Sequence, residues 1–422
     1  LIINVKEKHM KSTFNKSLVA ASLLLTFQAN AVDTAKINSS SDATFKSDIE
    51  HLEFQKNLSA NFATNVSNDV SDSVAAQERD WQGEVTTVPV LTILVEFPNA
   101  LHNTIKPAVT GHYFDDYSVE HYRKVVHAKG GYQGPAPELA TLPSMRDYLL
   151  DQSGGSFDIK GDVFGWYTAQ NDFKFYGEPT AFGKDVNARA LVIEAVENVL
   201  ADPNFKLSDY DANNDGVIDH LSIIHSALGQ ESGSNPDYIW SHRSTINTAV
   251  TNANTNLSAT IGSYIIQPVS AAAGVLAHEF GHDLGLPDEY DVHGTYDKYS
   301  QPGSTVGNWS MMAGGSWVGK IAGTNPSGYS PFAKLMLQNK YGGNWVQSTE
   351  IDASELTASG TTFKLHQAAT KGQFNDLVKV NLPEQTVQNF TPLNQQAYSA
   401  GSNSFAYMTN AVNLTQTENP KV

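Results

Sequence analysis

The 422-residue chain contains no cysteine. Disulfide bonds, thiolate metal ligands and a cysteine nucleophile are therefore excluded, and any transition metal must be bound by histidine and carboxylate side chains. A secreted protein without disulfide bonds needs another means of stabilising its fold. Calcium is the obvious candidate, because oxygen ligands suit that ion and carboxylates are abundant here.

Positive charge and long apolar runs are also scarce. The chain has 27 lysine and arginine residues against 44 aspartate and glutamate residues, a formal net charge of -17. This excess argues against a nucleic-acid or anionic-membrane partner, although most of the carboxylates are expected to form an ordinary solvated surface. No apolar run of about 18 residues is present, so we expect no membrane anchor. We expect a monomer.

The N-terminal residues resemble a secretory signal. The chain begins with Leu1, but the pattern starts at Met10, followed by two lysines and the apolar run 18–27. Ala29-Asn30-Ala31 fits the small-x-small cleavage rule. We therefore predict a signal peptide over residues 1–31, cut after Ala31, and a secreted, extracellular protein. The run is too short to anchor the chain by spanning a bilayer.

The composition then divides the chain into three further parts. Residues 32–86 are rich in Asn, Ser, Asp and Ala, and their place between signal and domain favours a propeptide over a linker, hence a zymogen. A strand-like run at 88–97 opens a folded domain that we place at 87–350. Within it, 188–200 has helical periodicity and 221–225 is typical of a buried strand. This mixture predicts an α+β unit.

After residue 350 the chain becomes rich in Asn, Gln, Ser and Thr. Residues 361–365 and 377–380 alternate like strands. We predict a β-rich accessory region over residues 351–422, and we expect it to be incomplete because the chain stops soon after a short apolar run at 411–414.

A zinc-binding pattern lies within residues 270–289, SAAAGVLAHEFGHDLGLPDE. His278 and His282 are four apart, so on a helix both imidazoles project from one face and can chelate one ion. Glu279 is placed to reach a metal-bound water instead of the metal. Gly285 ends the helix. His-Glu-x-x-His arises by chance in about one such chain in fifty, and a pair of surface histidines is the alternative.

The third zinc ligand has to be deduced. In one class of zinc peptidase a glutamate on a later helix supplies it, but Glu289 is the only glutamate between His282 and Glu350. In another class a glycine three residues past the second histidine turns the chain, and the ligand follows three residues later. Gly285 and Asp288 occupy those positions. Spacing favours Asp288 and leaves Glu289 as a rival.

A second element supports the long-motif class. Residues 307–315, GNWSMMAGG, combine methionines with a glycine-rich turn. In that class a methionine lies beneath the zinc as a hydrophobic base for the histidine ligands. We assign this role to Met312. A buried methionine that fills a gap in the core is the alternative.

These motifs carry a resemblance. HEFGHDLGLPDEYD at 278–291, followed by NWSMMAGGSW at 308–317, resembles the immune inhibitor A family of secreted bacterial metalloproteases. Further blocks at 142–168, 238–244 and 326–345 are similar to the same family, so the likeness runs over about 90–345. It implies a metzincin-like catalytic domain, a removable propeptide, activity on proteins, further β-domains, and zinc ligands and base at His278, His282, Asp288 and Glu279.

A second cation site is predicted at 209–219, DYDANNDGVID. Alternating oxygen-bearing side chains and a glycine in the turn are typical of a calcium loop. The glutamate expected at the twelfth position is absent, since Ser222 stands there, so this is not a regular EF-hand. An Asx-rich turn without an ion is the alternative. The predicted calcium ligands are Asp211, Asn213, Asp215, the carbonyl of Val217 and Asp219, with Asp209 as a substitute.

The sequence therefore predicts a secreted zinc endopeptidase that acts on protein or peptide substrates. Glu279 takes a proton from the zinc-bound water and passes it to the departing amine. The oxyanion needs a further donor, and the candidates, each with an equally good packing role, are Tyr290, His293, Tyr296, His242 and Arg243.

Two other functions fit parts of the sequence. A calcium-stabilised adhesion module would need a structural zinc with a fourth protein ligand, such as Asp291 or His293. Hydrolysis of a substrate other than a peptide, such as an ester, would use the same metal chemistry.

Overall fold

The computed structural model describes residues 2–5, 81–105, 114, 116–134, 141–179, 185–232, 235–290, 306–356, 361–365 and 377–381. The chain divides into two compact units, one of Leu1–Ala75 with Ile351–Lys364, the other of Ala76–Glu350 with Leu365–Val422. The proposed signal sequence from Met10 and most of the proposed propeptide lie outside the described residues. Within the described part, no helix is long and apolar enough to cross a bilayer.

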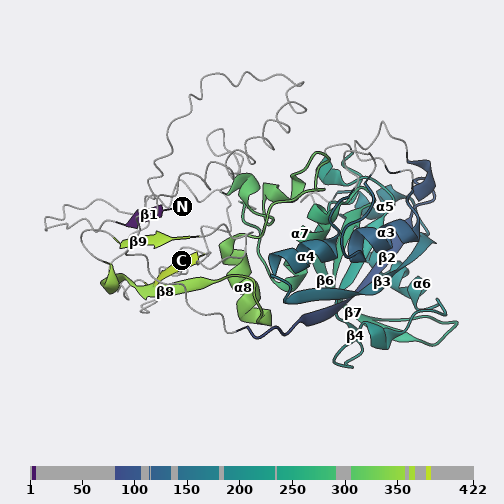
Figure 1. The fold of residues 1–422 in the computed structure, drawn as a ribbon. Coiled ribbons are helices and arrows are strands. Elements are labelled where there is room, and N and C mark those ends of the chain that lie inside the picture. The colour runs from purple at the N-terminus through teal and green to yellow at the C-terminus, as the bar shows by residue number, and fades with distance from the viewer. Residues whose placement is uncertain are drawn as a thin grey trace, which may run out of the picture. The chain divides into compact units, whose positions relative to one another are not determined.

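The larger unit is built on a six-stranded sheet with the order β3-β2-β5-β7-β4, to which β6 is added by pairing with β7 (Figure 1). Its pairings are parallel except for β6 with β7, which is antiparallel. The strands are β2 Thr86–Glu96, β3 Phe157–Thr168, β4 Val217–Ile218, β5 Leu221–His225, β6 His242–Thr251 and β7 Ser258–Pro268.

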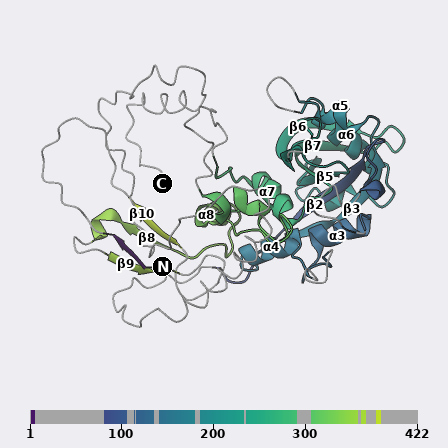
Figure 2. The same cartoon turned by 90° about the horizontal axis from the view of Figure 1, so that it is seen from above.

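Helices cover both faces of this sheet (Figure 2). Alternate residues of β2 face opposite ways, so Val90 and Leu94 pack in one core with α3, α4 and α7, while Leu91 and Ile93 pack in a second core with α6. The helices are α3 Val119–His127, α4 Met145–Gln152, α5 Phe173–Gly177, α6 Ala188–Val199, α7 Ala273–Leu284 and α8 Pro331–Tyr341.

The short 3-10 helices complete the described elements. They are η1 His102–Thr104, η3 Leu207–Asp209, η4 Gln230–Ser232, η5 Gly307–Trp309, η6 Gly314–Trp317 and η7 Ala353–Glu355.

The predicted elements form where the sequence patterns placed them. The apolar run at 88–97 lies almost wholly in β2, 221–225 is β5, and 188–200 contains α6. The predicted mixture of helices and strands is confirmed. Parallel strands with helices on both faces are more typical of α/β layering than of segregated α+β structure, because crossovers between parallel strands place helices on the faces.

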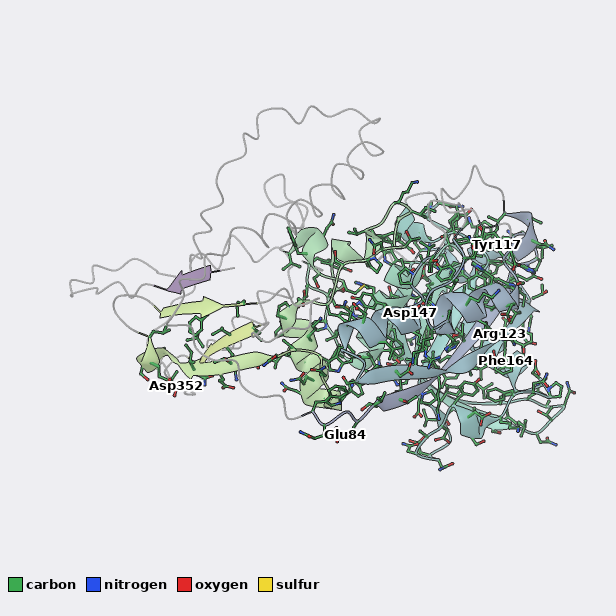
Figure 3. The ribbon with its side chains drawn as sticks, in the orientation of Figure 1. Glu84, Tyr117, Arg123, Asp147, Phe164 and Asp352 are labelled. Atoms are coloured by element: carbon green, nitrogen blue, oxygen red, sulfur yellow. The ribbon has the colours of Figure 1, made fainter. Side chains whose placement is uncertain are left out.

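Asp147, labelled in Figure 3, lies in the first turn of α4 and holds that turn against the chain before it. Asp147 and Ser144 form a reciprocal capping box. The same carboxylate accepts hydrogen bonds of 2.8 Å from the backbone N–H groups of Gly130 and Gly131. These bonds fix the position of α4, which packs with α7 in the same core.

The described residues after 346 include three short strands. β8 Ser348–Asp352 pairs with β10 Leu377–Asn381, and β9 Thr361–Lys364 pairs antiparallel with β1 Ile2–Val5. The strands expected at 361–365 and 377–380 are thus present. The remainder of the proposed accessory region lies outside the described residues, and its division into a domain stays a prediction.

A substitution at Gly274 tests how tightly α7 packs on η6. A methyl group there would overlap the backbone carbonyl oxygen of Ser316, which cannot move alone. We expect Gly274→Ala to lower the free energy of unfolding by about 3 kcal/mol. In Gly281→Ala the methyl group would lie 2.8 Å from the flexible Sδ of Met312, so the loss should be smaller. Urea denaturation measures both, and an equal or reversed order would contradict this packing.

Candidate metal centre

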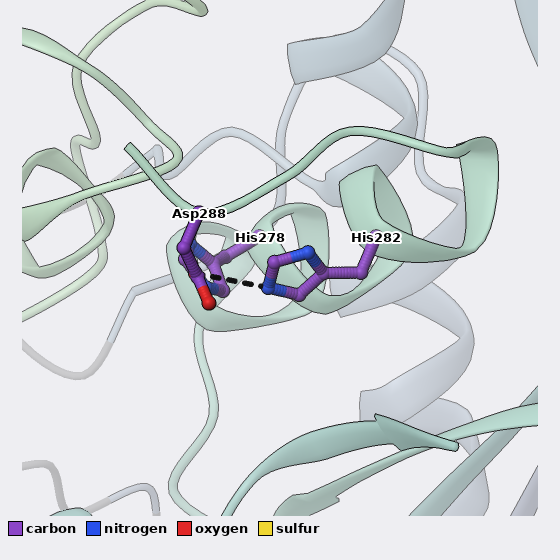
Figure 4. A group of neighbouring side chains, drawn as sticks. All are labelled: His278, His282 and Asp288. Carbon is purple, nitrogen blue, oxygen red and sulfur yellow. Dashed lines mark ion pairs between the residues drawn. The ribbon is translucent and has the colours of Figure 1, made fainter. Parts of the chain in front are cut away.

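α7 carries both histidines of the motif and ends at the predicted glycine. Gly285 has a φ of 106°, a left-handed conformation that glycine adopts without strain. The N–H of Leu286 then donates to the carbonyl of Gly281 at 2.9 Å. This turn reverses the chain, so that Asp288 lies over the face of the helix that carries the histidines (Figure 4).

Three side chains meet at this turn. Asp288 Oδ1 lies 3.4 Å from Nε2 of His278 and 3.1 Å from Nε2 of His282. Their ligand atoms are all within 4.8 Å of one another, and within the described parts of the chain no other group of three His, Cys, Asp or Glu side chains is as close. The structure therefore brings together the proposed zinc ligands.

The Nδ1 atoms of His278 and His282 are both hydrogen-bonded to backbone carbonyl groups. Nδ1 of His278 lies 2.8 Å from the carbonyl oxygen of Met311, and Nδ1 of His282 lies 2.9 Å from that of Leu286. A carbonyl only accepts, so each Nδ1 carries the hydrogen, and each neutral ring directs the Nε2 lone pair at Asp288. Lone pairs facing a carboxylate require a shared cation or an added proton, so the residues present fit a metal ion.

The pKa shifts of Asp288 and His282 also indicate that this geometry needs a positive charge. Burial raises the pKa of Asp288, but the two histidines, when they carry the added proton on Nε2, donate to it and lower that pKa to well below its usual range. Burial lowers the pKa of His282, yet Asp288 and the carbonyl of Leu286 raise it overall. Each partner thus favours a positive charge between the rings and the carboxylate, the place that a cation would take.

Glu279 lies beside this cluster and is buried, with 5% of its surface exposed. Its Oε2 has no hydrogen-bond partner in the described structure. Burial raises its pKa to about 7, and the charges of His278 and His282 oppose that rise. A buried carboxyl oxygen without a partner is costly, which is typical of a group kept for chemistry instead of stability.

The rival ligand Glu289 has a different partner. Its Oε1 accepts a hydrogen bond of 2.5 Å from Ser330, which caps α8, and its backbone N–H donates to the carbonyl of Met312 at 2.8 Å. Glu289 thus joins the turn to α8, while Asp288 faces the histidines. The geometry favours Asp288.

The methionine turn supports the cluster in two ways. Met311 and Met312 are fully buried, and Met312 Sδ packs against Gly281 on α7, between the two histidines in sequence. The assignment of Met312 as a hydrophobic base fits this contact. The sequence reasoning missed Met311, whose carbonyl orients His278, because no side-chain pattern reports a backbone contact.

Asp283 was also missed. Its side chain is 3% exposed, and it accepts hydrogen bonds of 2.6 Å from His220 Nδ1 and from Ser263 Oγ, with Arg243 Nε at 3.6 Å. Burial raises its pKa, but these partners lower it overall. These contacts fix α7 to the sheet beside His282. The sequence did offer one signal for this role, because Asp283 is a charged residue directly after the proposed ligand His282 on an otherwise apolar helix.

The proposed calcium residues form one compact loop before β4. The carboxylate of Asp211 accepts from the N–H groups of Asp215 and Gly216 at 3.0 and 2.8 Å. Asp215 accepts from Val217 at 2.9 Å, and Asp219 accepts from Ala212 at 2.8 Å. The loop is thus held by its own backbone, and calcium binding stays a prediction.

The metal cluster opens into a cavity of about 890 Å³. Its walls come from residues 240–243 at the start of β6, from α7, from the turn at 285–290 and from residues 313–317. Three of the proposed oxyanion donors line it, namely Tyr290, His242 and Arg243. The other two, and the fourth ligand considered for a structural zinc, lie outside the described residues: His293, Tyr296 and Asp291.

Comparison with known families agrees with this site. A family model described as immune inhibitor A peptidase M6, catalytic domain, matches residues 76–346. The chain belongs to the immune inhibitor A family of peptidases. The resemblance inferred from the motifs is confirmed, and the matched region is a metalloendopeptidase catalytic domain with mixed helices and strands.

Two curated relatives show the extent of the likeness. The pre-pro-metalloprotease PrtV of Vibrio cholerae is 37% identical over 337 residues, 74% of this chain and 36% of PrtV. Immune inhibitor A of Bacillus thuringiensis subsp. alesti is 35% identical over 346 residues, 75% of this chain and 49% of that protein. The chain thus spans about a third to a half of the length of these relatives.

A solved structure, metalloproteinase-II from Bacteroides fragilis, is 10% identical with a TM-score of 0.28, covering 65% of this chain and 59% of that chain. A likeness this low does not establish a common metzincin-like fold.

The contacts of Asp283 predict a stability effect. Asp283→Ala would leave His220 and Ser263 without their buried acceptor, so we expect the free energy of unfolding to fall by about 3 kcal/mol. Ser263→Ala removes one neutral donor and should cost about 1 kcal/mol. Chemical denaturation of both variants checks this order. A loss below that of Ser263→Ala would show that Asp283 does not hold the helix.

Proposed function

We propose that the protein is a secreted zinc endopeptidase, made as a zymogen, that hydrolyses peptide bonds in proteins. The observation that carries the proposal is the convergence of two imidazole nitrogens and one carboxylate beside the buried, unpartnered oxygen of Glu279. Three protein donors leave a coordination position open, as catalysis requires.

The donor set supports zinc. Two imidazoles and one carboxylate form a common catalytic zinc shell, and the chain has no thiolate that would favour a closed structural site. Zinc held by His278, His282 and Asp288 would acidify a water and polarise the scissile carbonyl.

The remaining chemistry belongs to the chain. Glu279 accepts the proton of the attacking water at its free Oε2 and then delivers that proton to the departing amine nitrogen. The carbonyls of Met311 and Leu286 hold the imidazoles in the tautomer that presents Nε2. Burial of Glu279 keeps bulk water from competing for that oxygen.

The cavity wall supports a peptide substrate over a small ester. β6, whose first residues line the cavity, pairs among the described strands with β7 alone. Its outer edge offers backbone groups to which an extended peptide can add as a further strand. A small ester lacks the backbone N–H and C=O groups that would pair with this edge.

Secretion and latency rest on the N-terminal sequence. Residues 1–31 have the features of a signal peptide and 32–86 those of a propeptide. The relative PrtV is named a pre-pro-metalloprotease, which supports a removable segment here.

Replacement of Glu279 tests the base. Glu279→Gln keeps the shape of the side chain but cannot accept the proton, so we expect casein hydrolysis to fall by roughly 10³-fold while the protein still binds zinc. Protease assays and zinc analysis of the purified mature variant measure both. Activity near that of the wild type would remove Glu279 from the mechanism.

Matched variants separate the two possible third ligands. Asp288→Asn should lose most of the bound zinc, whereas Glu289→Gln should keep it, because Glu289 accepts from Ser330 and a glutamine oxygen can do the same.

Casein digestion with and without a chelator separates the peptidase from an adhesion module with structural zinc, which would leave casein intact in both conditions.

We also propose that loop 209–219 binds calcium and stabilises the catalytic domain. In wild-type protein, millimolar calcium should raise Tm, since an ion at 100 times its Kd adds about 2.7 kcal/mol. Asp211→Asn, at a buried carboxylate of the loop, should abolish that shift. Glu197→Gln removes one exposed charge outside the loop and should keep it. Equal shifts in both variants would mean that the loop binds no calcium.

A further inference from the structure

We propose that Trp240 forms the subsite that selects a large apolar side chain of the substrate beside the scissile bond. This inference rests on the proposed peptidase activity and names a specificity determinant for it. Trp240 is 52% exposed and lines the same cavity as His278, Glu279 and His282. A large aromatic side chain left exposed in a binding cavity commonly marks a contact for a ligand.

The backbone of Trp240 is held from both sides. Its N–H donates to the carboxylate of Asp185 at 3.2 Å, and its carbonyl accepts a hydrogen bond of 2.7 Å from Nδ1 of His242. The other ring nitrogen of His242 lies 2.9 Å from the hydroxyl of Tyr264 on β7. Because His242 donates through Nδ1, its Nε2 accepts that hydroxyl hydrogen. These bonds tie the segment to the sheet.

The next residue is held as firmly. Ser241 donates to Glu231 twice, from its N–H at 3.1 Å and from its hydroxyl at 2.5 Å. Glu231 itself is folded back onto Gly229, where a methyl group would overlap its carboxylate. The side chains of Asp185, His242 and Glu231 therefore fix a two-residue stretch of cavity wall. Such anchoring fixes the backbone that carries the indole, which lowers the entropic cost of binding.

The chemistry of the wall favours an apolar side chain. Glu231, which also lines the cavity, accepts from Ser241 with both carboxylate oxygens and so holds this part of the wall in place. Trp317, 41% exposed, lines the cavity from residues 313–317, and Val275 and Leu286 add aliphatic surface. Two exposed indoles in one cavity offer apolar surface to an aromatic or large aliphatic side chain.

The test compares peptides that differ at one position beside the scissile bond, carrying Phe, Leu, Lys or Gly. The wild-type enzyme should cleave the Phe and Leu peptides with a kcat/KM about 10-fold or more above that of the Gly peptide. Trp240→Ala should bring this ratio to about 1, and Trp240→Phe should restore most of it. Mass spectrometry of the products identifies the position.

The control is Trp309→Ala, which removes an indole that is 78% exposed and does not line the cavity. It should leave the ratio unchanged. A wild-type preference for Lys, or an equal fall of kcat/KM on all peptides in Trp240→Ala at unchanged Tm, would overturn the subsite. Absence of any wild-type cleavage would instead refute the proposed function, so the two failures are distinguishable.

Discussion

The arrangement on which the site depends is two imidazole lone pairs directed at one carboxylate. The carbonyls of Met311 and Leu286 occupy the Nδ1 hydrogens of His278 and His282, so both Nε2 atoms face Asp288 without a hydrogen between them. This geometry is unfavourable by itself and becomes favourable when a cation supplies the missing positive charge. The contacts of Asp283 and of the methionine turn help to hold these groups in place.

Those contacts come from parts of the chain that are far apart in sequence. Asp283 ties α7 to His220 and Ser263 from its inner side, and the methionine turn packs against Gly281. The helix is therefore fixed between the sheet and the turn that follows it. Ligands on a rigid, packed helix keep their spacing with or without the ion, which lowers the cost of binding it.

The local part of this design could be predicted from sequence, and the remainder could not. Helical periodicity places His278 and His282 on one face, and glycine at 285 marks the turn, because both depend only on neighbouring residues. The choice between Asp288 and Glu289 depends on Ser330, and Asp283 meets a histidine 63 residues away. The predictions of strands at 88–97 and 221–225 and of a helix at 188–200 succeed for the same local reason. Adjacent residues specify conformation, whereas partners across the fold require the topology.

Residues 240–243 of the cavity wall are also held by contacts with residues that are distant in sequence. This wall uses Asp185 and Glu231 as hydrogen-bond acceptors for backbone and serine donors, whereas the buried Oε2 of Glu279 has no hydrogen-bond partner on the described chain. Asp288 Oδ1 and Glu289 Oε2 are likewise buried without a hydrogen-bond partner, so the buried, unpaired carboxylate oxygens of the described chain gather at and beside the proposed zinc site. Such unpaired oxygens lower stability, and natural proteins tolerate that cost at the place where chemistry needs it.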